Sequence, residues 1–201
     1  MALRAFGLNC TLKPSPGDSS TNKMMDLLLR ELGKHGVEGG SERAVDHDIK
    51  PGVTSDEGDG DAWPALRQRV LDADILVLAT PIWLGQPSSV AKRVLERMDA
   101  FLGEADDKGR YPSFGKVALV GVVGNEDGAH HVTAELYQAL GDVGFTIPAA
   151  ASAYWVGEAM GSVDFKDLDE VPDKVSSTIS MAASNAAHLA GLLKAQPYPG
   201  T

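Results

Sequence analysis

The chain has 201 residues, of which 43% are hydrophobic and 23% charged, so we expect one ordinary folded domain over residues 1–201. The formal net charge of -10 argues against nucleic acid as a partner. No apolar stretch approaches the ~20 residues that span a bilayer, so we do not expect a membrane partner either. The single cysteine, Cys10, excludes an internal disulfide framework. The first residues lack a signal-peptide layout and read better as a strand, so we expect a cytoplasmic protein.

Apolar runs that read as strands alternate with segments of helical periodicity. The expected strands are 3–8, a weaker one near 43–49, 75–79, 117–123 and 149–155. The expected helices are 22–34, 63–71, 88–102 (with Pro87 at its tolerant first turn), 131–143 and about 172–193. This alternation predicts an α/β fold, a three-layer sandwich with helices on both faces of a five-stranded parallel sheet. Five such strands fit the flavodoxin-like order 2-1-3-4-5.

Three loops follow the first, third and fourth expected strands and should open at one edge of the sheet, where such folds bind ligands. The first loop, 9–22, is crowded with hydroxyl side chains just before a helix. Hydroxyls and the free N–H groups of a helix start suit a phosphate, although plain helix capping selects the same residue types. The best donors are Ser19, Ser20, Thr21 and Asn22. The loop contains neither a G-x-G-x-x-G nor a Walker motif.

The second loop, 81–88, places Trp83 and Gly85 beyond the third strand, where an aromatic wall and a permissive backbone suit a flat ring. In the third loop, 124–130, Gly124 and Gly128 permit close backbone approach, and Asn125 and Glu126 can reach the edge of a heterocycle. A turn followed by a helix cap is the alternative interpretation of that loop. We expect no metal site, because the adjacent histidines 130 and 131 diverge. The acidic loop 56–61 lacks the rest of a calcium-binding pattern and is expected to be solvated.

Residues 80–88, Thr-Pro-Ile-Trp-Leu-Gly-Gln-Pro-Ser, resemble the T-P-[IV]-[YW]-x-G-x-P-S element of the NAD(P)H-dependent FMN reductase family in the flavodoxin-like superfamily. The first and third loops resemble the family's phosphate loop and third flavin loop, and the likeness covers nearly the whole chain. The resemblance implies non-covalently bound FMN. The implied phosphate residues are Thr11, Ser19, Ser20, Thr21 and Asn22; those along the ring are Pro81, Ile82, Trp83, Leu84, Gly85, Asn125, Glu126 and Gly128. Lys13 and Gly124 are further expected cofactor-binding residues.

The resemblance also implies an activity, in which NAD(P)H reduces the flavin and electrons pass to a quinone, a nitro or azo compound, or another small acceptor. No catalytic side chain is expected, because the flavin carries this chemistry. The alternatives are a non-enzymatic flavodoxin-type electron carrier or a flavin-binding sensor; the first loop lacks the compact T-x-[ST]-G-x-[TS] pattern of carriers. The resemblance further implies a homodimer or homotetramer. Cys10 is expected to be a core residue.

Overall fold

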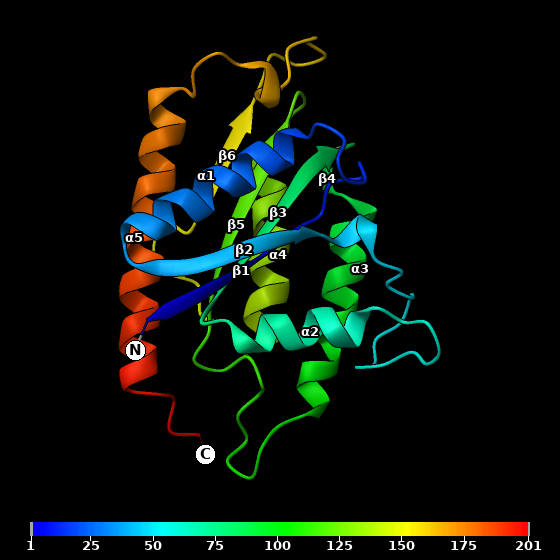
Figure 1. The fold of residues 1–201 in the computed structure, drawn as a ribbon, viewed down its shortest axis with the longest axis vertical. Helices are drawn as coiled ribbons and strands as arrows, with labels where there is room; N and C mark the ends of the chain where they lie inside the picture. The colour runs from blue at the N-terminus through cyan, green and yellow to red at the C-terminus, as the bar shows by residue number, and fades with distance from the viewer. Residues whose placement is uncertain (1, 201) are drawn as a thin grey trace.

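The computed structural model describes residues 2–200 and contains one mainly parallel sheet. Its strands are β1 (Leu3–Asn9), β2 (Val37–Arg43), β3 (Ile75–Trp83), β5 (Val117–Gly124) and β6 (Ser152–Val156). They lie in the order β2-β1-β3-β5-β6, and a short β4 (Gln86–Pro87) pairs antiparallel with the end of β3 (Figure 1). Since β4 lies off the main path, the parallel strands follow the order 2-1-3-4-5, and the flavodoxin-like prediction is confirmed.

Helices cover both faces of the sheet. One face packs against α1 (Ser20–Lys34) and α5 (Asp173–Ala195), and the other against α2 (Trp63–Asp72), α3 (Ser89–Met98) and α4 (Ala129–Asp142). Figure 1 shows α5 along one side of the molecule and α3 along the other. Short 3-10 helices are η1 (Ala44–Asp46), η2 (Asp99–Gly103) and η3 (Phe165–Asp167). Within residues 2–200, no helix is long and apolar enough to cross a membrane.

The central strands are apolar on both faces, which explains their continuous hydrophobic runs. Along β3, Ile75 and Val77 contribute to the core under α1 and α5, whereas Leu76 and Leu78 contribute to the core under α2, α3 and α4. Alternation of side chains along a strand divides one run between two cores. Burying each such side chain contributes about 1.5–3 kcal/mol, so β3 fixes both outer layers to the sheet.

The second strand was predicted near 43–49, and that prediction is wrong because β2 spans Val37–Arg43. As an edge strand, β2 has one buried side chain, Val37, and shows no apolar run. A Cβ on Gly39 would lie 2.1 Å from the carbonyl oxygen of Ala5, so glycine permits the close pairing with β1. The apolar signal at 43–49 came from Ala44 and Ile49, which are buried beyond the strand.

The third strand continues past its predicted end. Thr80 and Pro81 still pair with β5, and Ile82 and Trp83 pair with β4. Pro87 therefore belongs to β4 and not to the first turn of α3. The N-cap of α3 is Ser88, whose hydroxyl accepts a hydrogen bond from the N–H of Ala91.

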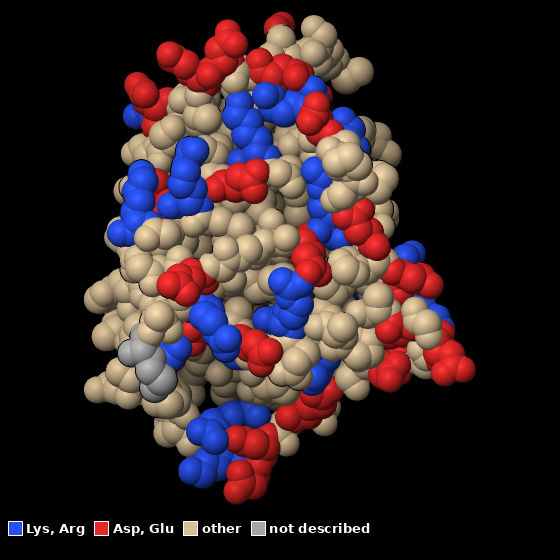
Figure 2. All heavy atoms as spheres, viewed as in Figure 1, with Lys and Arg blue, Asp and Glu red and all other residues tan. Residues whose placement is uncertain are grey.

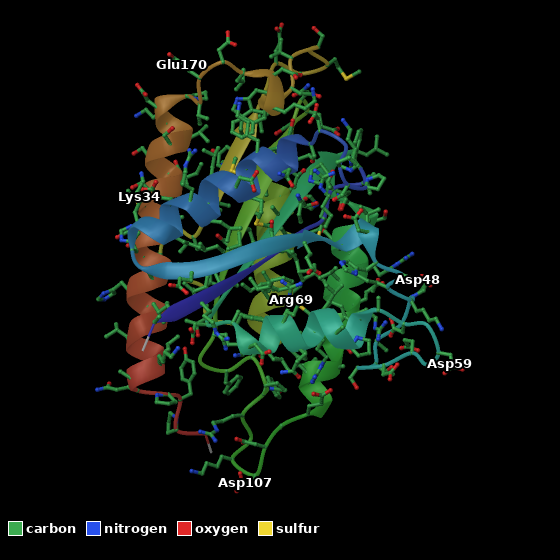
Figure 3. All side chains as sticks on the ribbon, viewed as in Figure 1. Lys34, Asp48, Asp59, Arg69, Asp107 and Glu170 are labelled. Carbon is green, nitrogen blue, oxygen red and sulfur yellow. The ribbon has the colours of Figure 1, made fainter. Side chains whose placement is uncertain are left out.

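The acidic loop 56–61 is not simply solvated, and that prediction is wrong for Asp61. Its carboxylate lies 2.7 Å from Nη2 of Arg97, and both side chains are fully buried. Burial opposes the charge on Asp61, but the Arg97 guanidinium and backbone N–H groups of the loop hold the pKa of this carboxyl well below its usual range. Asp59, by contrast, lies at the outer end of the loop (Figure 3). The buried pair fastens the loop to α3.

Candidate functional site

A cavity of about 510 Å³ opens at the edge where β1, β3, β5 and β6 end. All of the predicted cofactor residues line it except Asn22, Gly85 and Gly128. The lining residues that the sequence predicted are Thr11, Lys13, Ser19, Ser20, Thr21, Pro81, Ile82, Trp83, Leu84, Gly124, Asn125 and Glu126. Those that it missed are Leu12, Val123, Trp155, Met160, Gly161 and Asp164. The three predicted loops therefore meet at one cavity, together with a fourth segment after β6.

One end of the cavity is the N-terminus of α1. Ser19 is the N-cap, and its hydroxyl accepts a hydrogen bond from the N–H of Asn22 and donates one to Oγ1 of Thr11 at 3.0 Å. The backbone N–H groups of Ser20 and Thr21 find no acceptor among residues 2–200. Unpaired N–H groups at a helix start carry partial positive charge and bind anions. This end of the cavity therefore has the donors that a phosphate needs.

Asn22 lies outside the cavity and supports the loop from behind. Its Oδ1 accepts a hydrogen bond from Nδ2 of Asn9 at 3.2 Å, and its Nδ2 donates to Asp26 at 2.8 Å. Asn22 lines a second, polar cavity of about 600 Å³, which Arg43 and Arg30 also line.

Gly85 and Gly128 pack against each other beside the cavity. A Cβ on Gly128, whose φ is +125°, would lie 2.9 Å from Cα of Gly85. A side chain at Gly128 would therefore push the second and third loops apart. Both residues shape the wall without lining the cavity.

The other end of the cavity combines apolar side chains with the polar groups of Asn125 and Glu126. Trp83 is 55% exposed and Leu84 is 91% exposed, at the turn between β3 and β4. Both turn residues have positive φ, 53° at Leu84 and 73° at Gly85, which is the pattern of a tight hairpin turn. The N–H of Leu84 donates to Oε1 of Glu126 at 2.8 Å. Glu126 thus holds the turn, a role that the sequence did not predict for it.

A covering segment, 157–168, links β6 to the start of α5 and borders the cavity. The carbonyl oxygen of Asn125 accepts a hydrogen bond from the N–H of Met160, and its Nδ2 donates to the Gly161 carbonyl and to Asp164. The N–H of Lys166 donates to Oγ of Ser20 at 3.1 Å. Asn125 and Ser20 therefore tie this segment to two of the predicted loops. Trp155 could have been found by the rule used for the other loops, since it lies near the carboxyl end of β6.

Two other sequence predictions concern residues beside the site. Cys10 is fully buried, as predicted, and burial raises the pKa of its thiol far above its usual range. The ring of His130 lies 3.1 Å from the Tyr154 hydroxyl, whereas that of His131 lies 2.8 Å from a Glu135 oxygen. The two histidines therefore diverge, as expected from their adjacency.

The side chains and N–H groups that line the cavity match the chemical groups of FMN. Hydroxyl and free N–H groups gather at one end, and an exposed indole and aliphatic side chains form the other. FMN has the same division, since its flat ring presents apolar faces with polar edges and its other end carries one phosphate. The acidic chain shows mixed charges on the face that carries α1 and β2 (Figure 2). This face therefore offers no broad basic surface, and the donors suited to a phosphate are the local ones at the start of α1.

Comparisons with known proteins agree with this geometry. Residues 4–160 match the family described as NADPH-dependent FMN reductase. The chain is 36% identical over 208 residues to an 8-demethyl-8-aminoriboflavin-5'-phosphate synthase of Streptomyces davaonensis, a match that covers 98% of this chain and 81% of that protein. It is 40% identical over 200 residues to the divalent metal cation transporter MntH of Mycobacterium bovis. That match covers 96% of this chain but spans only 29% of the transporter's length.

Two solved structures share the fold of this chain. The crystal structure of RosB with bound 8-demethyl-8-formylriboflavin-5'-phosphate superposes with a TM-score of 0.88 at 35% identity, covering 98% of this chain and 82% of that one. An apo NADH:FMN oxidoreductase, EMOB, has a TM-score of 0.67 at 19% identity, covering 94% and 89%, and so shares the fold. The chain therefore belongs to the NADPH-dependent FMN reductase family, and it is a flavin-dependent oxidoreductase that uses FMN and NAD(P)H.

Proposed function

We propose that the cavity binds one FMN, with the phosphate at the N-terminus of α1 and the ring against the 81–85 turn and the third loop. The protein then passes electrons from NAD(P)H to a small acceptor such as a quinone, a nitro compound or an azo compound. The observation that carries this proposal is the division of a single cavity. Free N–H groups and hydroxyls line one end, and the half-exposed Trp83 lines the other.

The side chains bind, orient and exclude water, while bound FMN supplies the redox chemistry between nicotinamide and acceptor. Ser19, Ser20 and the adjacent N–H groups hold the phosphate. The covering segment and Trp83 keep water from the ring. Glu126 and Asp164 accept hydrogen bonds from Leu84 and Asn125 and so support the walls of the cavity. We therefore assign no catalytic side chain.

We further propose that the protein works in the cytoplasm as a homodimer or homotetramer whose second copy covers the mouth of the cavity. Large apolar side chains are exposed around this mouth: Leu84 at 91%, Met160 at 93% and Val163 at 54%. Such exposure marks a contact surface. Light scattering tests the oligomer, and a monomer at micromolar concentration would contradict it.

The experiment that tests the function combines a titration and an assay. Calorimetry should give about one FMN per chain and weak FAD binding, because the cavity has one phosphate end. NADH or NADPH oxidation is then followed with a panel of quinone, nitro and azo acceptors. Turnover with any of them supports the proposal. An electron carrier or sensor would bind FMN but show no nicotinamide oxidation above the rate of free FMN.

A second candidate function is modification of the flavin itself. The similarity to the Streptomyces davaonensis synthase, at 36% identity over 98% of this chain, favours it. The name of that protein describes a flavin phosphate altered at position 8. Mass spectrometry of the flavin after incubation with NAD(P)H and acceptors separates the two candidates. An unchanged FMN mass supports the reductase, and a product altered at position 8 supports modification.

A further inference from the structure

Arg43 makes an unusual set of contacts with the first loop, which spans residues 10–19 in the structure. It is the last residue of β2 and pairs with Asn9, the last residue of β1. Its Nη1 donates to three backbone carbonyl oxygens of the loop, those of Lys13 at 3.1 Å, Pro14 at 3.0 Å and Gly17 at 2.7 Å. One guanidinium therefore binds the loop at two places, residues 13–14 and residue 17.

The corner after β2 supplies a second anchor. Oδ1 of Asp46, the last residue of η1, accepts a hydrogen bond from the N–H of Ser15 at 2.9 Å. The hydrogen bonds from Ser15 lower the pKa of Asp46, so this carboxyl stays ionised. Arg43 and Asp46 thus fasten the outer side of the first loop.

The inner side of the same loop lines the candidate FMN cavity through Thr11, Lys13 and Ser19. Arg43 does not line that cavity; it lines a neighbouring polar cavity of about 600 Å³ on the other side of the loop. The Nη2 of Arg43 also donates to Oδ1 of Asn22 in the first turn of α1 at 3.4 Å. Any effect of Arg43 on a phosphate in the FMN cavity must therefore pass through the loop, through Asn22 or through its charge.

We propose that Arg43 is a positioning residue for the flavin phosphate, a proposal that rests on the placement of that phosphate at the N-terminus of α1. Arg43 holds the first loop in the one conformation that brings Thr11 and Ser19 next to the free N–H groups of α1. A loop that is already ordered loses less conformational entropy when the phosphate binds. Without the guanidinium, the carbonyls of Lys13 and Gly17 lose this donor, that of Pro14 keeps only the N–H of Gly17, and the loop samples other conformations.

Arg30 provides a control for charge alone. It lies on α1 and lines the same polar cavity as Arg43. Within the described residues it makes no side-chain hydrogen bond to the first loop. Arg30→Met therefore removes one positive charge from the same neighbourhood and leaves the contacts of the loop intact.

The test compares FMN with riboflavin, which lacks the phosphate, by calorimetry on wild type, Arg43→Met and Arg30→Met. We expect Arg43→Met to weaken FMN binding about tenfold, equivalent to about 1.4 kcal/mol, and to change riboflavin binding by less than about twofold. Arg30→Met should change neither by more than about twofold. Asp46→Ala, which removes the second anchor, should weaken FMN binding by a smaller factor and leave riboflavin binding unchanged. This variant replaces Arg43→Met in the test if Arg43→Met does not fold.

Each other outcome overturns the inference. An equal loss for both flavins would make Arg43 a general structural residue, and no loss would remove it from the site. A loss in Arg30→Met equal to that in Arg43→Met would assign the effect to charge. Riboflavin binding as tight as FMN binding in wild type would instead take the phosphate out of the first loop, and the proposed FMN site would fail with the inference.

Discussion

Replacing Trp83 with alanine tests the aromatic wall of the cavity. The residue is 55% exposed at the end of β3. A tryptophan has up to ~250 Å² to bury, so about 140 Å² of it remains accessible. A ring lying on one face would cover about half of that, ~70 Å², which at ~25 cal/mol per Å² amounts to ~1.7 kcal/mol. Trp83→Ala should therefore weaken FMN binding about 10- to 20-fold without abolishing it.

Calorimetric titration with FMN measures this loss, and Trp83→Phe is the matched control because it keeps an aromatic face. We expect the phenylalanine variant to bind within about threefold of wild type. Tryptophan fluorescence adds a second measurement. Trp63 is fully buried on α2 and does not line the cavity, so its fluorescence does not report direct contact with FMN. Trp155 lines the cavity, so its fluorescence should also be quenched by FMN. An Ala variant that binds FMN as tightly as wild type would show that Trp83 does not contact the ring.

Further predictions address the phosphate end, the covering segment and the buried ion pair. Ser20→Glu should weaken FMN binding more than a hundredfold, because the new carboxylate and the phosphate, ~5 Å apart, repel by about 3 kcal/mol at an effective dielectric of ~20. The control Ser184→Glu, at an exposed site on α5, should bind FMN as tightly as wild type in the same titration. Asn125→Ala should speed hydrogen exchange over 160–166 and weaken FMN binding several-fold, whereas Asn185→Ala should do neither. Asp61→Asn should lower the urea-unfolding free energy by about 3 kcal/mol by leaving Arg97 buried without a charge partner, and Asp59→Asn should not. Since folding depresses the pKa of Asp61, its stabilisation is present above the unfolded value of about 3.9 and is lost as pH falls through the folded value; equal acid sensitivity of Asp61→Asn and wild type would contradict this.

The sequence predicted the elements that are buried on both sides. Runs such as that of β3 or β5, alternating with helical segments, favour a covered parallel sheet, and the loops after parallel strands share an edge. The amphipathic pattern of α1 likewise fixed its place to within two residues. These features depend on local periodicity, which a single sequence displays.

The missed features depend on contacts between distant parts of the chain. The edge strand β2 is polar because one of its faces meets solvent, so its pattern resembles that of a loop. The roles of Glu126 and Asn125 as supports follow from partners on other loops, Leu84 and Gly161. The Asp61 and Arg97 pair joins residues 36 positions apart, and a charged residue in a Gly-rich stretch is usually exposed.

Reduction of bound flavin tests the central claim most directly. Protein loaded with one equivalent of FMN is mixed anaerobically with NADH or NADPH while the visible flavin band is followed, and a quinone is then added. The account predicts binding of one FMN per chain, bleaching of the band by at least one nicotinamide, recovery with the quinone, and FMN binding more than a hundredfold weaker in Ser20→Glu. Failure to bind FMN, or a bound flavin that neither nicotinamide reduces faster than free FMN, would contradict it.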